Sequence, residues 1–253
     1  VGDAFRTRMF NWSKVNAPYL FEADSTAITG ILFSSPSRDY VDKFEGLGMF
    51  ATTDGGSDEL WWSESTLDSV YERDYLGEHR GVLKVLVNEH IPFNILLVPS
   101  QAELNQYESV FMPNIQAITD EEAQRLRLYV QQGGQLIVTG PNPTGMNEYG
   151  TTRSNYALAD LLGFNRGQAL PSSKVQSYGA GKTHYFSAPL GKQYLANNNI
   201  TARTTLANKV RSVSTVSVTT NADDRVYVET SQLNKQAVQQ FTNFIGLNGN
   251  FSV

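Results

Sequence analysis

The sequence predicts a three-layer α/β fold with a mostly parallel sheet and a β-rich C-terminal extension. Continuous apolar runs, rather than alternating ones, occur at 27–33, 93–98 and 135–139, and strands buried on both faces of a parallel sheet have this pattern. Segments with apolar residues at helical spacing lie between the runs. After residue 206 the pattern changes to alternating Val, Thr and Ser, which is typical of antiparallel strands.

The first part of the chain supplies an arm, a strand and a helix. Residues 1–24 contain scattered aromatic residues without a clear period, and we expect an extended or partly helical arm that lies on a neighbouring surface. The first central strand is expected at 27–33, and a loop at 34–39 then lies at its carboxyl end, where open α/β sheets bind ligands. A helix is expected over Glu78–His90, and Pro92 ends it before the second strand.

The clearest βαβ unit of the chain runs from Tyr107 to Gly140. Its first strand ends at Pro113, which cannot donate to a ladder. Thr119 and Glu122 form a capping box at the start of the helix. The residues that define the buried face of the helix and its glycine stop are Ala123, Leu126, Val130 and Gly133. A buried strand at 135–139 completes the unit.

These patterns predict three parts: an N-terminal arm at 1–24, an α/β domain at 25–205 and a β-rich tail at 206–253. The remaining expected elements are a short helix at 155–162, a strand at 182–186, and tail strands around Val213–Val218, Arg225–Thr230 and Ala237–Phe244.

Composition and charge exclude several classes of partner. The formal net charge is −5 and no basic block is present, so we expect binding neither to nucleic acid nor to an anionic membrane. No apolar run is long enough to predict a membrane span. The absence of Cys removes disulfides and thiolate metal sites. A composition rich in Asn, Ser, Thr, Gln and Tyr and poor in Lys favours an exported protein, periplasmic or extracellular, and the missing initial Met indicates a processed or excised chain.

No cofactor, metal or nucleophile motif is complete. Gly179–Thr183 is similar to the end of a phosphate loop, but Gln176 stands where the motif needs its first glycine, and a strand rather than a helix follows. The three histidines, His79, His90 and His184, lack the spacing of a zinc site. Serines at expected strand ends have no G-x-S-x-G elbow around them; they are Ser34, Ser35 and Ser100.

The segment at 54–75 gathers acids and aromatic residues, and three functions for it remain open. Aromatic faces beside carboxylates suit sugar binding, and two acids placed across a sugar suit glycoside hydrolysis. The third alternative is a loop whose tryptophans anchor it to the body or to a partner protein. The candidate ligand or interface residues are Asp58, Glu59, Trp61, Trp62 and Tyr71, together with Arg38 and Asn142, which follow expected strands.

The chain resembles a known family through the βαβ unit described above. The matching residues are Pro113-Asn114, Thr119–Glu122, Leu126, Tyr129-Val130 and Gly133–Gly140, supported by His90–Asn94, Leu158–Gly163 and Gly181–Phe186. This pattern resembles the middle domain of family 42 β-galactosidases, which is called the trimerisation domain and has a flavodoxin-like, class I glutamine amidotransferase-like fold. The resemblance covers residues 26–195, and Gln240–Gly246 resembles the start of the small β-sandwich that ends those enzymes.

The resemblance implies a domain without amidotransferase chemistry. In catalytic members of the wider superfamily, a Cys occupies the turn after the strand that matches 135–139. Here that turn reads Gly140-Pro141-Asn142-Pro143 and offers no nucleophile. We therefore expect a non-catalytic domain of a carbohydrate-active protein. Its expected partners are the catalytic barrel of a parent polypeptide or identical subunits. The alternatives are a glycoside hydrolase, or a module that binds carbohydrate, with the site at 54–75 in either case.

Overall fold

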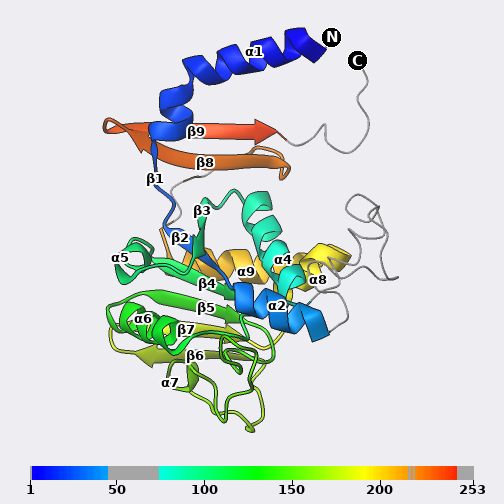
Figure 1. Cartoon of the computed structure of the whole chain (residues 1–253), viewed down its shortest axis with the longest axis vertical. Helices are drawn as coiled ribbons and strands as arrows, with labels where there is room; N and C mark the ends of the chain where they lie inside the picture. Colours follow the sequence, from blue (N-terminus) through cyan, green and yellow to red (C-terminus); the bar gives the residue numbers. More distant parts are fainter. Residues whose placement is uncertain (1, 45–73, 216–217, 219, 244–253) are drawn as a thin grey trace.

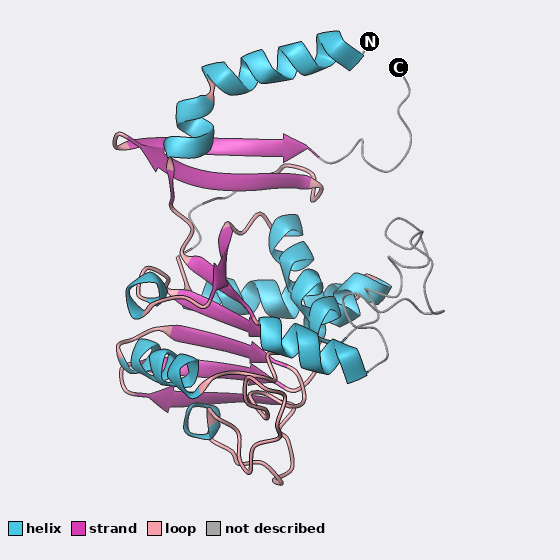
Figure 2. Cartoon of the chain, in the orientation of Figure 1, coloured by secondary structure: helices cyan, strands magenta, loops and turns pink. Residues whose placement is uncertain are grey.

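The computed structural model describes residues 2–44, 74–215, 218 and 220–243 (Figure 1). An α/β body carries a six-stranded sheet with helices on both faces, and a separate small sheet lies beyond it (Figure 2). The strands of the body are β2 (Thr29–Phe33), β3 (Phe93–Leu97), β4 (Ser109–Pro113), β5 (Gln135–Thr139), β6 (Ser173–Tyr178) and β7 (Gly181–Phe186).

The large sheet has the order β3-β2-β4-β5-β7-β6. The first five strands in this order are parallel to their neighbours, and β6 runs antiparallel to β7 at the edge. In the central register, Ile31 lies between Ile95 and Phe111. The predicted fold class, a mostly parallel sheet with a β-rich extension, is therefore confirmed.

Two apolar cores lie on the two faces of the sheet. Alternate residues of one strand enter different cores: Val110 and Met112 pack on one face, and Phe111 packs on the other. The first face is covered by α6 (Asp120–Gln131) and α7 (Ala159–Leu162), and the second by α4 (Asp74–Asn88), α8 (Leu190–Asn197) and α9 (Ile200–Val213). The other body helices are α2 (Ser35–Phe44) and α5 (Gln101–Leu104).

The βαβ unit from β4 to β5 has the local structure that its sequence predicts. Thr119 Oγ1 accepts a hydrogen bond from Glu122 N at 3.0 Å, and Glu122 Oε2 accepts one from Thr119 N at 2.9 Å. Gly133 has a positive φ of 117° and follows the C-cap residue Gln132. The predicted capping box and glycine stop are confirmed.

The segment expected as a loop after the first strand is helical instead. Ser34 Oγ accepts a hydrogen bond from Ser37 N at 3.0 Å, so Ser34 caps α2. Pro36 lies in the first helical turn, where its missing N–H costs nothing. The helix therefore begins immediately after β2, and the predicted loop at 34–39 is wrong.

Strand β6 and helix α9 also differ from the expected elements. The β6 sequence alternates between exposed and half-buried residues at a sheet edge, so it carries no apolar run to mark it. Helix α9 is capped by Asn199, whose Oδ1 accepts from Ala202 N at 3.1 Å, and it extends to Val213. The helix continues across residues 205 and 206 and includes Val213, so the predicted strand that begins at Val213 is wrong. The division of the chain into three parts stays a prediction.

The small sheet joins the two ends of the chain. It has the order β1-β8-β9, with bounds β1 (Asp24–Ser25), β8 (Val226–Leu233) and β9 (Gln236–Asn243). The N-terminal arm is largely helical, with α1 (Gly2–Val15) and a π-helical turn η1 (Pro18–Glu22). Gln240 of β9 donates to the carbonyl of Tyr19 at 2.8 Å. The arm and the tail therefore form one layer, and α1 projects from it (Figure 1).

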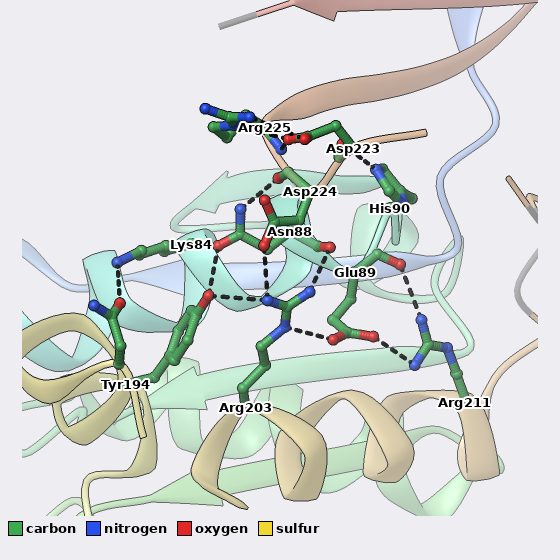
Figure 3. A network of polar contacts seen from close by, with 11 residues as sticks. Lys84, Asn88, Glu89, His90, Tyr194, Arg203, Arg211, Asp223, Asp224 and Arg225 are labelled. Carbon is green, nitrogen blue, oxygen red and sulfur yellow. Dashed lines mark hydrogen bonds and ion pairs between the residues drawn. The ribbon is translucent and has the colours of Figure 1, made fainter. Parts of the chain in front are cut away.

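An arginine network joins the body to the turn before β8 (Figure 3). The guanidinium of Arg203 contacts Glu89 Oε1 at 2.6 Å and Asp224 Oδ2 at 3.0 Å, and donates to the carbonyl of Asn88 at 2.9 Å. Because its side chain is largely buried and reaches from α9 to the end of α4 and to Asp224, Arg203 fixes these three segments relative to one another.

Candidate functional site

The carboxyl edge of the parallel strands is the place where this architecture binds ligands. The chain moves from β2 outward to β3 and then returns across β2 to β4, so the strand order reverses between β2 and β4. A crevice outside the carboxyl ends of strands at such a point is the usual site in open α/β sheets. The residues that follow β2, β4 and β5 therefore decide what this edge can do.

A serine cluster closes the crevice between β2 and β4. Ser34 Oγ donates to the carbonyl of Ala117 at 2.9 Å and contacts Ser37 Oγ at 2.9 Å. Ser37 is fully buried, and its Oγ accepts from the amides of Gln116 at 3.1 Å and Ala117 at 2.9 Å. Tyr75 Oη accepts from Ser34 N at 2.6 Å. These hydroxyls bind backbone groups and each other, so the local hydrogen bonds hold the two loops together.

The space left beside the serine cluster is small and mostly apolar. It measures about 30 Å³ and lies among Leu32, Leu104, Ile115 and Leu126. Pockets for sugars or drug-sized ligands measure about 300–1,000 Å³. The described part of this edge therefore has room for about a single water molecule rather than a sugar ring.

The turn after β5 has no room for a nucleophilic side chain at its first position. Gly140 has a φ of +104°, and a Cβ built there would lie 2.2 Å from Asn114 Oδ1. The Gly140 carbonyl accepts from Tyr185 Oη at 2.9 Å, and its amide donates to Phe186 O at 3.0 Å. The conformation and the contacts of this turn both require glycine.

The structure places the predicted residues Arg38 and Asn142 in separate local contacts. Arg38 Nε pairs with Asp39 Oδ1 at 2.7 Å, and its guanidinium lies 5.8 Å from the ring centre of Phe33. Asn142 Nδ2 donates to Gln116 Oε1 at 2.9 Å. Each side chain already has a partner, and their role as ligand or interface positions stays a prediction.

The other predicted site residues lie outside the described residues. They are Asp58, Glu59, Trp61, Trp62 and Tyr71. The sugar-binding, hydrolytic and anchoring alternatives for the segment at 54–75 therefore stay predictions.

A buried carboxyl group beside the turn after β5 was missed in the sequence. Glu78 of α4 is fully buried; its Oε1 accepts from Thr139 Oγ1 at 2.7 Å and its Oε2 from the amide of Lys192 at 2.7 Å. Burial raises the pKa of Glu78 to about 7, while the hydrogen bonds from Thr139 and from the amides of Lys192 and Gly191 oppose that rise. The available signal was the position of Glu78, four residues before Val82 on the apolar face of the helix.

The geometry gives Glu78 a structural role. Its carboxylate accepts two of the amides at the start of α8, which makes it a cap supplied from a different helix. Lys192 Nζ pairs with Asp74 Oδ1 at 2.6 Å in the same region. In the described ranges, no group of three or more His, Asp or Glu side chains is placed to hold a metal ion. The helices described also include none with the length and apolar character needed to cross a membrane.

Comparison with known proteins agrees with this architecture. The family model described as "Beta-galactosidase trimerisation domain" matches residues 57–246, more than half of the chain. A curated relative, an exo-β-D-glucosaminidase from Pyrococcus horikoshii, is 31% identical over 77 residues, which are 30% of this chain and 10% of that protein.

Solved structures with the same fold include larger enzymes. A β-galactosidase from Bacillus circulans sp. alkalophilus matches with a TM-score of 0.58 and 14% identity, covering 88% of this chain and 36% of that one. An α-L-fucosidase from Paenibacillus thiaminolyticus matches with a TM-score of 0.57 and 10% identity, covering 92% and 40%. This chain thus spans well under half the length of these proteins. The expected family is confirmed: the chain belongs to the β-galactosidase trimerisation domain family.

Proposed function

We propose that this chain is an accessory domain of a carbohydrate-active protein, which acts through protein–protein contact and carries no catalytic step of its own. Its partners in this proposal are a catalytic barrel of the same polypeptide or identical subunits. The closed carboxyl edge supports the absence of a catalytic step, because Ser34, Ser37 and Glu78 are used in hydrogen bonds that hold the fold together.

The observation that carries the proposal is the exposed apolar surface of α1. Phe5, Met9 and Trp12 are spaced to share one face of this 14-residue helix. Phe5 and Trp12 are each 54% exposed. An isolated helix of about this length is marginal in water, and a group of exposed large apolar side chains marks an interaction site. Protein contact on this face would stabilise the helix.

A second exposed apolar surface lies on the edge strand β3. Ile95 and Leu97 point to the same face of the sheet, and Leu97 is 69% exposed. Among the described strands only β2 pairs with β3, so the outer edge of β3 presents free backbone groups. Exposed apolar edge strands favour pairing with another chain. The chain therefore has two surfaces suited to protein association.

Replacing both Phe5 and Trp12 with Ser is expected to weaken association of the chain. The substitutions remove the largest apolar side chains from the α1 face without touching either core of the body. Sedimentation velocity over a range of protein concentrations measures the effect, which we expect as at least a tenfold weaker self-association, about 1.4 kcal/mol.

Tyr149→Ser is the matched control, since Tyr149 is an exposed aromatic residue in a distant loop. It should leave association unchanged, and circular dichroism should show the same fold in all variants. A wild-type chain that stays monomeric at every concentration would exclude identical subunits as the partners. Equal association of the double variant and the wild type would exclude the α1 face.

A further inference from the structure

A polar cleft lies near the amino ends of β5 and β7, at the opposite end of the strands from the closed carboxyl edge. It has a volume of about 600 Å³. Its walls include Gln135 at the start of β5, Lys182 and His184 of β7, and Lys209 and Arg211 of α9. Neither the family match nor the proposed function assigns a role to this cleft.

Two lysines in the cleft form no ion pair within the described part of the chain. Neither the ammonium group of Lys182 nor that of Lys209 forms an ion pair or a hydrogen bond with a described residue. Arg211, in contrast, is paired with Glu89 at 2.8 Å. The cleft therefore concentrates positive charge in a chain whose net charge is −5.

One acidic residue, Glu108, also lines the cleft, and its carboxylate contacts a backbone amide rather than a lysine. Glu108 Oε2 accepts a hydrogen bond from the amide of Thr215 at 2.6 Å. The helix dipole accounts for basic residues in the last turns of α9, where positive charge is favoured. It does not account for Lys182, which belongs to a strand.

A buried histidine lies beneath the two lysines. His184 is only 5% exposed, and its Nε2 lies 3.0 Å from Gln135 Oε1. Because Gln135 Nε2 donates to the carbonyl of Gly133 at 3.2 Å, Gln135 Oε1 is the acceptor and His184 Nε2 carries the proton. His184 Nδ1 is then the unprotonated nitrogen, and it is buried without a partner among the described residues.

The lysine charges act directly on this imidazole. Burial, together with the charges of Lys209 and Lys182, lowers the pKa of His184 to about 4. A negative ion between the ammonium groups would reverse the electrostatic part of this effect. A bound anion would therefore favour the protonated form of the ring.

We propose that this cleft binds a small inorganic oxyanion such as phosphate between Lys182 and Lys209, beside the buried imidazole of His184, whose protonation the bound ion favours. The groups that face the imidazole are Gln135 from β5, Lys182 from β7, and Lys209 from α9, with Glu108 and the paired Arg211 at the rim. Two cations and an ionisable ring suit an anion better than a neutral sugar.

Titration of the histidine rings by NMR tests the proposal. Phosphate at millimolar concentration is expected to raise the pKa of His184 by about one unit relative to sodium chloride at the same ionic strength. His79 lies outside the cleft and serves as an internal control, because phosphate should leave its pKa unchanged. Lys182→Gln combined with Lys209→Gln should raise the pKa of His184 without phosphate, because two repelling charges are gone, and should abolish the response to phosphate.

Lys235→Gln removes one exposed positive charge elsewhere and should preserve the phosphate response. A phosphate response no larger than that of chloride would overturn the proposal, since salt screening would then explain it. A response that survives in the double variant would overturn it as well. The pKa of His184 could instead rise with protein concentration in the absence of phosphate. That result would contradict the proposal, because it would show that a carboxylate of another copy of the chain binds in the cleft.

Discussion

Replacing Gly81 with alanine is expected to lower the free energy of unfolding by about 3 kcal/mol, although alanine is the better helix former. Gly81 lies inside α4, where exchange of glycine for alanine would ordinarily stabilise the helix by about 1 kcal/mol. A Cβ at Gly81 would lie 2.0 Å from the carbonyl oxygen of Gly191 and 2.1 Å from its carbon. The helices α4 and α8 must therefore separate, because backbone atoms cannot rotate away.

The reverse contact explains why the loss is large. A Cβ at Gly191 would meet the carbonyl of Glu78 and the amide of Val82, both at 2.6 Å. The two glycines thus form a close helix crossing, and moving α8 away also pulls its first amides from the Glu78 carboxylate. Both packing and hydrogen bonding are lost together.

Urea denaturation followed by circular dichroism measures this effect. Asn208→Ala is the control, because Asn208 is exposed on α9 and its replacement changes helix propensity by only a few tenths of a kcal/mol. If Gly81→Ala stabilised the protein as it would an exposed helix, the close crossing of α4 and α8 would be wrong.

Replacing Glu78 with alanine is expected to cost about 4 kcal/mol at pH 5. The substitution leaves the Thr139 hydroxyl and the amides of Lys192 and Gly191 without their buried acceptor. It also opens a cavity where a fully buried side chain stood. Glu78→Gln keeps an acceptor and a similar shape, so it should cost far less than Glu78→Ala at the same pH. Chemical denaturation of both variants provides the comparison.

The pH dependence of the Glu78→Gln variant isolates the titration of the carboxyl group. The pKa of Glu78 is raised from 4.5 to about 7 in the folded protein, so the folded state binds the proton more tightly than the unfolded state. This tighter proton binding contributes fully to stability below pH 4.5, and the contribution is lost as pH rises to 7. Relative to Glu78→Gln, the wild type should therefore lose about 3 kcal/mol of stability between pH 4.5 and pH 8.

Two buried histidines make the comparison with Glu78→Gln necessary. The pKa values of His79 and His184 are lowered from 6.5 to about 4, mainly by burial. Their contribution to stability is present above pH 6.5 and is lost as pH falls toward 4, which is the opposite direction. Both histidines remain in the variant, so the difference between the two proteins cancels their effect. A difference that does not vary with pH would show that Glu78 titrates alike in both states.

Local signals in the sequence were sufficient to predict the central βαβ unit. The capping box at Thr119 and Glu122, the glycine stop at Gly133 and the apolar strand that follows are all determined within a few residues. The same logic, applied to Ser34 and Pro36, would have predicted the start of α2. Serine and proline are also frequent in turns, so the same residues favour a loop equally well.

Local sequence patterns could not predict that the carboxyl edge of the sheet is closed. Ser37 binds the amides of Gln116 and Ala117, residues about eighty positions away in the chain. Gly81 and Gly191 meet only after α4 and α8 have packed on the same face. Neither contact has a local pattern, because each depends on which strands become neighbours in the sheet. The absence of a nucleophile was visible in the sequence, whereas the packing that leaves no room for one required the structure.

The central proposal, that this chain acts by contact and not by catalysis, is tested most directly by an activity assay on the purified chain. Aryl glycosides and glutamine should each be incubated with the wild type and with Ser34→Ala, at protein concentrations where association is also measured. We expect hydrolysis of both compounds to stay at the uncatalysed rate in every sample. Turnover at an enzyme-like rate, above about 1 per second, would contradict the account.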